Sequence, residues 1–67
     1  METELATPIN IHRGQTLFTQ GETPVKITKI GKNHIIVCLK LQVRNRIRYQ
    51  FRFDGTGYKR QNEYLYI

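Results

Sequence analysis

Residues 34–54, HIIVCLKLQVRNRIRYQFRFD, carry the clearest structural signal of the chain, because apolar and polar side chains alternate along almost the whole stretch. A repeat of two residues is the pattern of β-strands that bury one face and leave the other in water. The alternation keeps one phase only if residues 44–46, Arg-Asn-Arg, form a turn. Asn tolerates the left-handed conformation that a three-residue hairpin usually needs. The sequence therefore predicts a hairpin with an apolar inner face and a basic outer face.

The predicted turn also fixes the register, which is the set of residues that face each other across the hairpin. On the inner face we expect Leu41 opposite Tyr49, Leu39 opposite Phe51 and Val37 opposite Phe53. On the outer face we expect Lys40 opposite Gln50, Gln42 opposite Arg48 and Cys38 opposite Arg52. The aromatic residues of the second strand share the phase of the aliphatic residues of the first, so we expect them in the core.

Short runs rich in β-branched and aromatic residues alternate with turn residues along the rest of the chain. We expect residues 1–8 to be a flexible lead-in and residues 9–67 to form a single domain. The expected strands are residues 16–19, 25–30 and 63–67, with 9–12 as a short first strand or edge segment and 58–62 as a polar connection. No stretch keeps a 3.6-residue period, so we expect no helix longer than a turn or two.

The strand at residues 25–30 meets the central hairpin through Gly31, Lys32 and Asn33. If these three residues form the turn, Ile27 faces Val37 and Val25 faces Leu39. Ile30 and Ile36 then lie on the other face. Either that face is partly covered, or a bulge shifts the register there, as in small barrels that bend their strands.

About five short strands within about sixty residues favour a small barrel over a two-layer sandwich, and closure also protects the sheet edges. We predict an all-β fold, a small SH3-like barrel of about five short antiparallel strands. An OB-like barrel is the second choice, because an OB-fold usually accommodates a helix between its strands.

Three segments strengthen this expectation: GQTLF at residues 14–18, PVKITKIG at 24–31 and FDGTGY at 53–58. Together they resemble the short β-barrel proteins encoded by phages and prophages, which often read as a Gly-led strand, a "V-x-K-I-G" strand and a "F-D-x-x-T-G" turn. The resemblance covers roughly residues 14–67 and implies the fold and a phage-like origin. It supplies no functional residues, and the Arg-rich hairpin departs from the pattern.

The composition excludes several classes of protein. A domain of 67 residues lies near the lower limit of what folds without disulfides or metals. The single Cys38 forms no internal disulfide, and with His12 and His34 it does not make a structural zinc set. Asp54 and Glu63 are too few and too separated for paired-carboxylate chemistry. We therefore predict no enzyme activity, no metal and no cofactor.

The chain carries no run long enough to span a bilayer, and its start, METELATPIN, lacks the features of a signal peptide. With a single thiol as well, this predicts a cytoplasmic protein that does not enter the membrane.

The formal net charge is +6, from eleven Lys and Arg against five Asp and Glu. The outer positions of the hairpin hold the candidate binding residues Lys40, Arg44, Arg46, Arg48 and Arg52. Alternating Arg side chains lie about 6.5–7 Å apart along a strand, close to the repeat of phosphates along a nucleic acid. Arg also forms paired hydrogen bonds with phosphate. The alternatives are an acidic protein partner and a solvated face that binds nothing.

Tyr64 and Tyr66 complete the candidate site. They compete with Leu65 and Ile67 for the inner face of the last strand. If the two tyrosines face outward beside the arginines, they supply a platform on which bases can stack. Otherwise they pack with their hydroxyls at the rim.

The sequence thus predicts a small basic binding module, an accessory protein of phage or prophage origin that contacts nucleic-acid phosphates, of DNA or RNA, through its hairpin. One alternative is an inhibitor or adaptor that docks on an acidic surface of a host protein. Another is a structural protein that forms a homodimer or a larger homo-oligomer.

Overall fold

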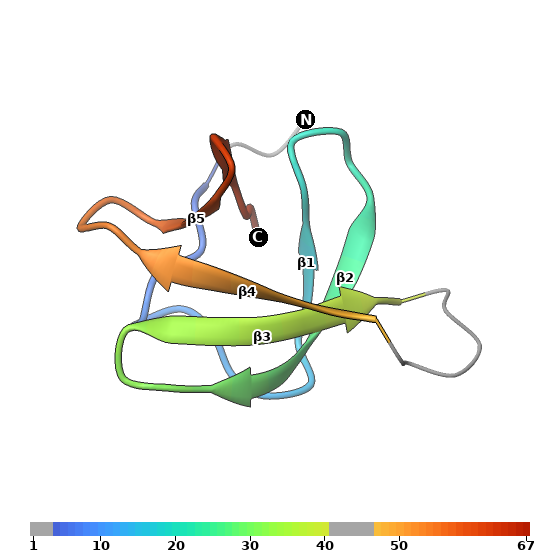
Figure 1. Ribbon diagram of the computed structural model, residues 1–67, viewed down its shortest axis with the longest axis horizontal. Helices are drawn as coiled ribbons and strands as arrows, with labels where there is room; N and C mark the ends of the chain where they lie inside the picture. The colour runs from blue at the N-terminus through green and yellow to red at the C-terminus, as the bar shows by residue number, and fades with distance from the viewer. Residues whose placement is uncertain (1–3, 41–46) are drawn as a thin grey trace.

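The structure, a computed structural model, describes residues 4–40 and 47–67 (Figure 1). In these residues the strands are β1 (Thr16–Phe18), β2 (Pro24–Ile30), β3 (His34–Leu39), β4 (Arg48–Phe53), β5 (Tyr58–Arg60) and β6 (Glu63–Tyr64). They form one antiparallel sheet in chain order, and the described residues contain no helix. The all-β prediction is confirmed, with six strands where about five were expected.

The sheet curls into a half-barrel, so that β1 and the C-terminal residues lie side by side (Figure 1). Phe18 and Tyr66 exchange two backbone hydrogen bonds of 2.8 Å. On its other side Tyr66 is bridged to Leu5, and the flanking Ala6 N–H donates to the Leu65 carbonyl at 2.9 Å. The C-terminal segment is therefore paired on both sides, which covers backbone groups that an open edge would expose.

The N-terminal segment, expected as a flexible lead-in followed by a short strand, packs on the sheet as a loop from Glu4 on. Ala6 is fully buried in the core. The Thr7 N–H donates to Asn10 Oδ1 at 2.7 Å, and residues 9–12 adopt no strand. Ile11 packs against the core, whereas Ile9 is 95% exposed. The folded domain therefore includes residues that the composition assigned to the lead-in.

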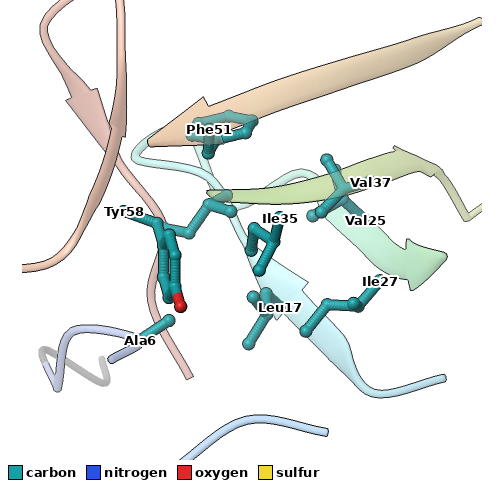
Figure 2. Close-up of a cluster of buried hydrophobic side chains, with 9 residues drawn as sticks. Ala6, Leu17, Val25, Ile27, Ile35, Val37, Phe51 and Tyr58 are labelled. Carbon is teal, nitrogen blue, oxygen red and sulfur yellow. The ribbon is translucent and has the colours of Figure 1, made fainter. Parts of the chain in front are cut away.

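The core lies on the inner face of the curled sheet (Figure 2). It consists of Ala6, Leu17, Val25, Ile27, Ile35, Val37, Phe51, Tyr58 and Leu65. Phe51 is buried as expected, while Tyr49 and Phe53 are half-buried and pack against the cluster. Because each buried aliphatic or aromatic side chain contributes about 1.5–3 kcal/mol, this inner layer is the main source of stability.

The pairing of β2 with β3 follows the predicted register. Val25 faces Leu39 and Ile27 faces Val37. The register then shifts by one residue between Ile27 and Lys29, so that Ile36 faces Lys29 rather than Thr28. Of the two alternatives for this end of the hairpin, the bulge is the one observed. A bulge of this kind bends its strand and increases the local twist.

The predicted register between β3 and β4 is wrong. Val37 faces Tyr49 and Cys38 faces Arg48, in place of the expected Phe53 and Arg52. Leu41 was expected opposite Tyr49; its own position and that of the predicted turn at 44–46 lie outside the described residues. The partner of each β3 residue differs by four residues along β4, and such an even shift keeps every side chain on its expected face. The alternation therefore predicted the faces and could not predict the partners.

The C-terminal region also differs from the prediction, because residues 58–62 are not a polar connection. Tyr58 begins β5 and is only 1% exposed. Gln61 and Asn62 have φ angles of +50° and +67°, the left-handed pair that closes a two-residue hairpin between β5 and β6. Gln-Asn is a weaker turn signal than Asn-Gly, and the sequence pattern did not reveal the hairpin.

Candidate polyanion-binding surface

Cross-strand pairing arranges the outward-facing side chains in rows. The first row runs through Thr16 on β1, Lys26 on β2, Cys38 on β3 and Arg48 on β4. The second row runs through His34 on β3, Arg52 on β4, Lys59 on β5 and Tyr64 on β6. With strands about 4.8 Å apart, the backbones of Lys26 and Arg48 are about 10 Å apart. The two rows lie about 13–14 Å apart along β4, at about 3.4 Å per residue.

These rows define a surface that we call the outer basic face: Lys26, Lys40, Arg48, Arg52 and Lys59. All are exposed except Lys59, which is half-buried. No acidic residue occurs in strands β2–β5; the acidic residues of the described chain lie in loops or on β6, and are Glu4, Glu22, Asp54 and Glu63. Arg52 on β4 directly faces Lys59 on the neighbouring strand β5. Like charges opposite each other destabilise a sheet, so an anion bound here would relieve a repulsion.

The Lys40 side chain, which follows β3, extends across β2 to Thr16 on β1. Its Nζ donates to Thr16 Oγ1 at 2.9 Å, and its backbone N–H donates to the Pro24 carbonyl at 3.2 Å. The ammonium group therefore lies beside Thr16, which is the cross-strand partner of Lys26. The Lys40 ammonium and the backbone of Lys26 thus both lie beside Thr16 at one end of the face.

The predicted arginines of β4 lie where the alternation placed them. Arg48 and Arg52 are exposed and share the outer phase of β4 with Gln50. Arg44 and Arg46, the other two predicted arginines, lie outside the described residues. Lys26 and Lys59 belong to the same face and were missed, although the burial of Val25 and Ile27 on either side implies that Lys26 points outward.

Tyr64 lies on the outer face beside Lys59, whose Nζ is 5.5 Å from the centre of the tyrosine ring. The Tyr64 hydroxyl donates to Asp54 Oδ2 at 2.6 Å. The backbone N–H groups of Thr56 and Gly57 donate to the Oδ1 atom of the same carboxylate at 2.8 and 3.2 Å. These hydrogen bonds, the one from Tyr64 first, lower the pKa of Asp54 to about 2, and the bond to Asp54 raises the pKa of Tyr64. Asp54 is therefore a fixed anion that holds Tyr64 and the β4–β5 turn.

Tyr66 shares the outer phase but lies at another part of the sheet, paired with Phe18 on β1. It is half-buried, whereas Phe18 is 40% exposed. The structure therefore separates the two predicted tyrosines: Tyr64 lies in the second row, next to Lys59, and Tyr66 lies next to Phe18. Sequence reasoning missed Phe18, although an inward Leu17 implies an outward neighbour.

Cys38 is more buried than expected for its outer phase, with 1% of its surface exposed. It lies between Lys26 and Arg48 in the first row. His34 is half-buried beside Arg52, and His12 is exposed in a loop. Within residues 4–40 and 47–67, no three His, Cys, Asp or Glu side chains gather in a way that could hold a metal ion.

A hollow of about 370 Å³ opens on the inner-phase side of the sheet, away from the basic rows. The hollow is lined by Thr19, Gly21, Thr23, Val25, Leu39, Tyr49, Phe51, Arg60 and Glu63. Arg60 is half-buried, and its guanidinium carbon lies 4.9 Å from the centre of the Tyr49 ring. This cation–π contact holds Arg60 on the wall of the hollow, so it does not extend the outer basic face.

Comparison with protein-family models, with curated proteins and with solved structures gives no match for this chain. In the described part of the chain there is no helix long and apolar enough to cross a membrane.

Proposed function

We propose that this protein binds nucleic acid through phosphate contacts made by the outer basic face, with little sequence specificity. The observation that supports the proposal best is the placement of Lys26, Arg48 and Arg52 on one face of the sheet, in strands that contain no acidic residue. Such a face attracts a polyanion along its whole length. The expected phage or prophage origin and cytoplasmic location stay predictions.

Phosphate contacts fit the chemistry of this face. Arg48 and Arg52 each offer a planar fork of N–H donors that matches two phosphate oxygens, and the lysines act as point charges. Contacts of this kind fix the position of a strand and read no bases. An acidic protein surface would be attracted by the same cations. However, the regular spacing of the two rows matches the repeat of a nucleic-acid backbone and is not a feature that an acidic protein surface would recognise.

The test measures fluorescence anisotropy of labelled single- and double-stranded DNA and RNA with the protein at 50 and 200 mM salt. The test variant is Arg48→Glu/Arg52→Glu, which reverses two exposed charges on β4. The matched control is Arg13→Glu/Lys32→Glu, which reverses two exposed charges in turns. Each variant lowers the formal net charge of +6 by the same amount, so any difference between them reports position.

If four phosphates are contacted, the affinity of the unmodified protein for duplex should fall roughly 150-fold between the two salt concentrations. The test variant should bind at least about tenfold more weakly at 50 mM salt. Its slope of log affinity against log salt concentration should fall by the equivalent of about two phosphate contacts, while the control keeps the slope of the unmodified protein. Equal losses of affinity in the two variants would show that binding depends on net charge alone and would refute a binding site on the outer basic face. No binding of the unmodified protein at 50 mM salt would overturn the proposal and favour an acidic protein partner.

A further inference from the structure

An apolar row lies next to the first basic row on the outer face of the sheet. Backbone pairing joins Pro24 on β2 to Phe18 on β1, Phe18 to Tyr66, and Tyr66 to Leu5. We call these four residues the aromatic strip. Phe18 is 40% exposed, and the other six Phe and Tyr side chains of the protein, all in the described part of the chain, are half-buried or buried.

The strip continues directly into the basic face. Lys40 joins its end, because the Lys40 N–H donates to the Pro24 carbonyl at 3.2 Å. Thr16 precedes Phe18 by two residues on the same face, a separation of about 6.5–7 Å along β1. The Lys40 ammonium lies 2.9 Å from Thr16 Oγ1, and Lys26 is the cross-strand partner of Thr16. The Lys40 ammonium and the backbone of Lys26 therefore both lie beside Thr16, two residues along β1 from Phe18.

This spacing suits one nucleotide of an unpaired strand. Neighbouring phosphates of an extended strand are separated by a similar distance, and each base of such a strand offers a free π-face. Binders of single strands combine a basic track with aromatic side chains on which bases stack. In a duplex the faces of the bases are already stacked on their neighbours, so no base is free to stack on Phe18.

We propose that the aromatic strip makes this protein selective for single-stranded nucleic acid, with a base stacked on Phe18 beside Tyr66 and the adjoining phosphate at Lys26 and Lys40. The inference rests on the proposed function and specifies its substrate class. The basic rows supply the attraction that all nucleic acids share, and Phe18 supplies the discrimination against duplex.

The first test uses truncation. Phe18→Ala should weaken binding of a labelled thymidine oligonucleotide about 5- to 150-fold, the loss that corresponds to one stacked base. Its affinity for a hairpin duplex should change less than about twofold, since phosphate contacts alone hold the duplex. The matched control is Ile9→Ala, a truncation of a side chain that is 95% exposed and lies outside the strip; it should change neither affinity.

The second test uses tryptophan fluorescence. It replaces Phe18 by a larger aromatic side chain, so it does not depend on whether the truncated variant Phe18→Ala folds. The protein contains no tryptophan, so Phe18→Trp introduces a single reporter at the proposed stacking position. The thymidine oligonucleotide should quench this fluorophore on binding, and the hairpin duplex should not. In Ile9→Trp the fluorophore should be insensitive to both.

The outcomes separate this inference from the proposed function. If the unmodified protein binds neither oligonucleotide, the proposed function itself is overturned. The inference about single strands is overturned by three results together: the unmodified protein binds both oligonucleotides equally well, Phe18→Ala binds as tightly as the unmodified protein, and the emission of Phe18→Trp is unchanged. In that case the proposed phosphate-binding face stands.

Discussion

Leu17 and Phe18 are neighbours on the short strand β1 that point to opposite faces, and they offer a sharp test of the fold. Leu17 is fully buried in the core, whereas 40% of Phe18 remains in water. We predict that Leu17→Ala destabilises the protein considerably more than Phe18→Ala, although phenylalanine is the larger side chain. The reason is that only Leu17 leaves a cavity enclosed by other core side chains.

The magnitude follows from the burial of the two side chains. Leu17→Ala removes three carbon atoms, a transfer loss of about 2.4 kcal/mol at about 0.8 kcal/mol per buried CH₂ group. The cavity left in the core raises the total to about 3–4 kcal/mol. Full burial of a phenylalanine is worth about 1.5–3 kcal/mol, so the partly exposed Phe18 should cost about 1–2 kcal/mol when truncated. A domain of 67 residues has a total stability of about 3–10 kcal/mol, so Leu17→Ala removes a large part of it.

Urea denaturation followed by circular dichroism measures both free energies of unfolding. With a slope of about 1 kcal/mol per molar urea, the midpoint should fall by about 3–4 M for Leu17→Ala and by about 1–2 M for Phe18→Ala. If Leu17→Ala is unfolded without urea, Leu17→Val gives a milder version of the same comparison. A loss for Phe18→Ala equal to or greater than that for Leu17→Ala would show that the two faces of β1 are interchanged. It would also remove Phe18 from the proposed binding surface.

Two further predictions concern the β4–β5 turn. The pKa of Asp54 is lowered from 3.8 to about 2, so its contribution to stability is complete above about pH 5 and is lost as the pH falls toward 2. Urea midpoints at pH 2, 3, 4 and 6 should therefore fall less steeply in Asp54→Asn than in the unmodified protein, and parallel curves would contradict the assignment. Gly57→Ala should destabilise the protein by about 1–3 kcal/mol, because the added Cβ would lie 3.2 Å from Tyr64 Cδ1 and 3.3 Å from the Ala6 carbonyl oxygen. The matched control Gly21→Ala, whose nearest neighbour would be 4.0 Å away, should leave thermal unfolding nearly unchanged.

The period-two alternation was enough to predict the fold class and the two faces of the central strands. Ile35, Val37 and Phe51 point inward, and Arg48 and Arg52 point outward, as expected. Alternation is reliable here because burial of one face forces every second residue into the same layer. The pairing of Val25 with Leu39 and of Ile27 with Val37 was also predictable, whereas next to the turn the bulge shifts the register by one residue.

The partners across β3 and β4 were not predictable from the same pattern. A shift of four residues along β4 preserves the alternation, so the pattern does not separate the two registers. In the observed register Phe51 lies opposite Ile35, which is fully buried, rather than opposite Leu39, which is half-buried. The depth at which each β3 residue is buried therefore selects the register. That depth depends on how β1 and the C-terminal segment pack against the inner layer, which the alternation does not contain.

The exposed aromatic site required the curled topology. Tyr66 meets Phe18 only because the C-terminal residues bridge back to β1, a contact between positions far apart in the chain. From the sequence, Phe18 reads as one more apolar residue in a short strand. Its meaning changes when the structure places Lys26 and the Lys40 ammonium beside Thr16, two residues away from it on the same face of β1.

The pairing of β4 with β5 makes the basic face denser than the sequence suggested, because it places Lys59 opposite Arg52. In the expected register Arg52 faced Cys38 and Arg48 faced Gln42, so each arginine had an uncharged partner. In the structure Arg52 lies between His34 and Lys59, and Arg48 lies in one row with Lys26. Because these rows are about 13–14 Å apart along β4, a bound strand must run roughly along β4 to contact both. A variant that removes one row should therefore shorten the contacted length of the nucleic acid and reduce the salt dependence, rather than abolish binding.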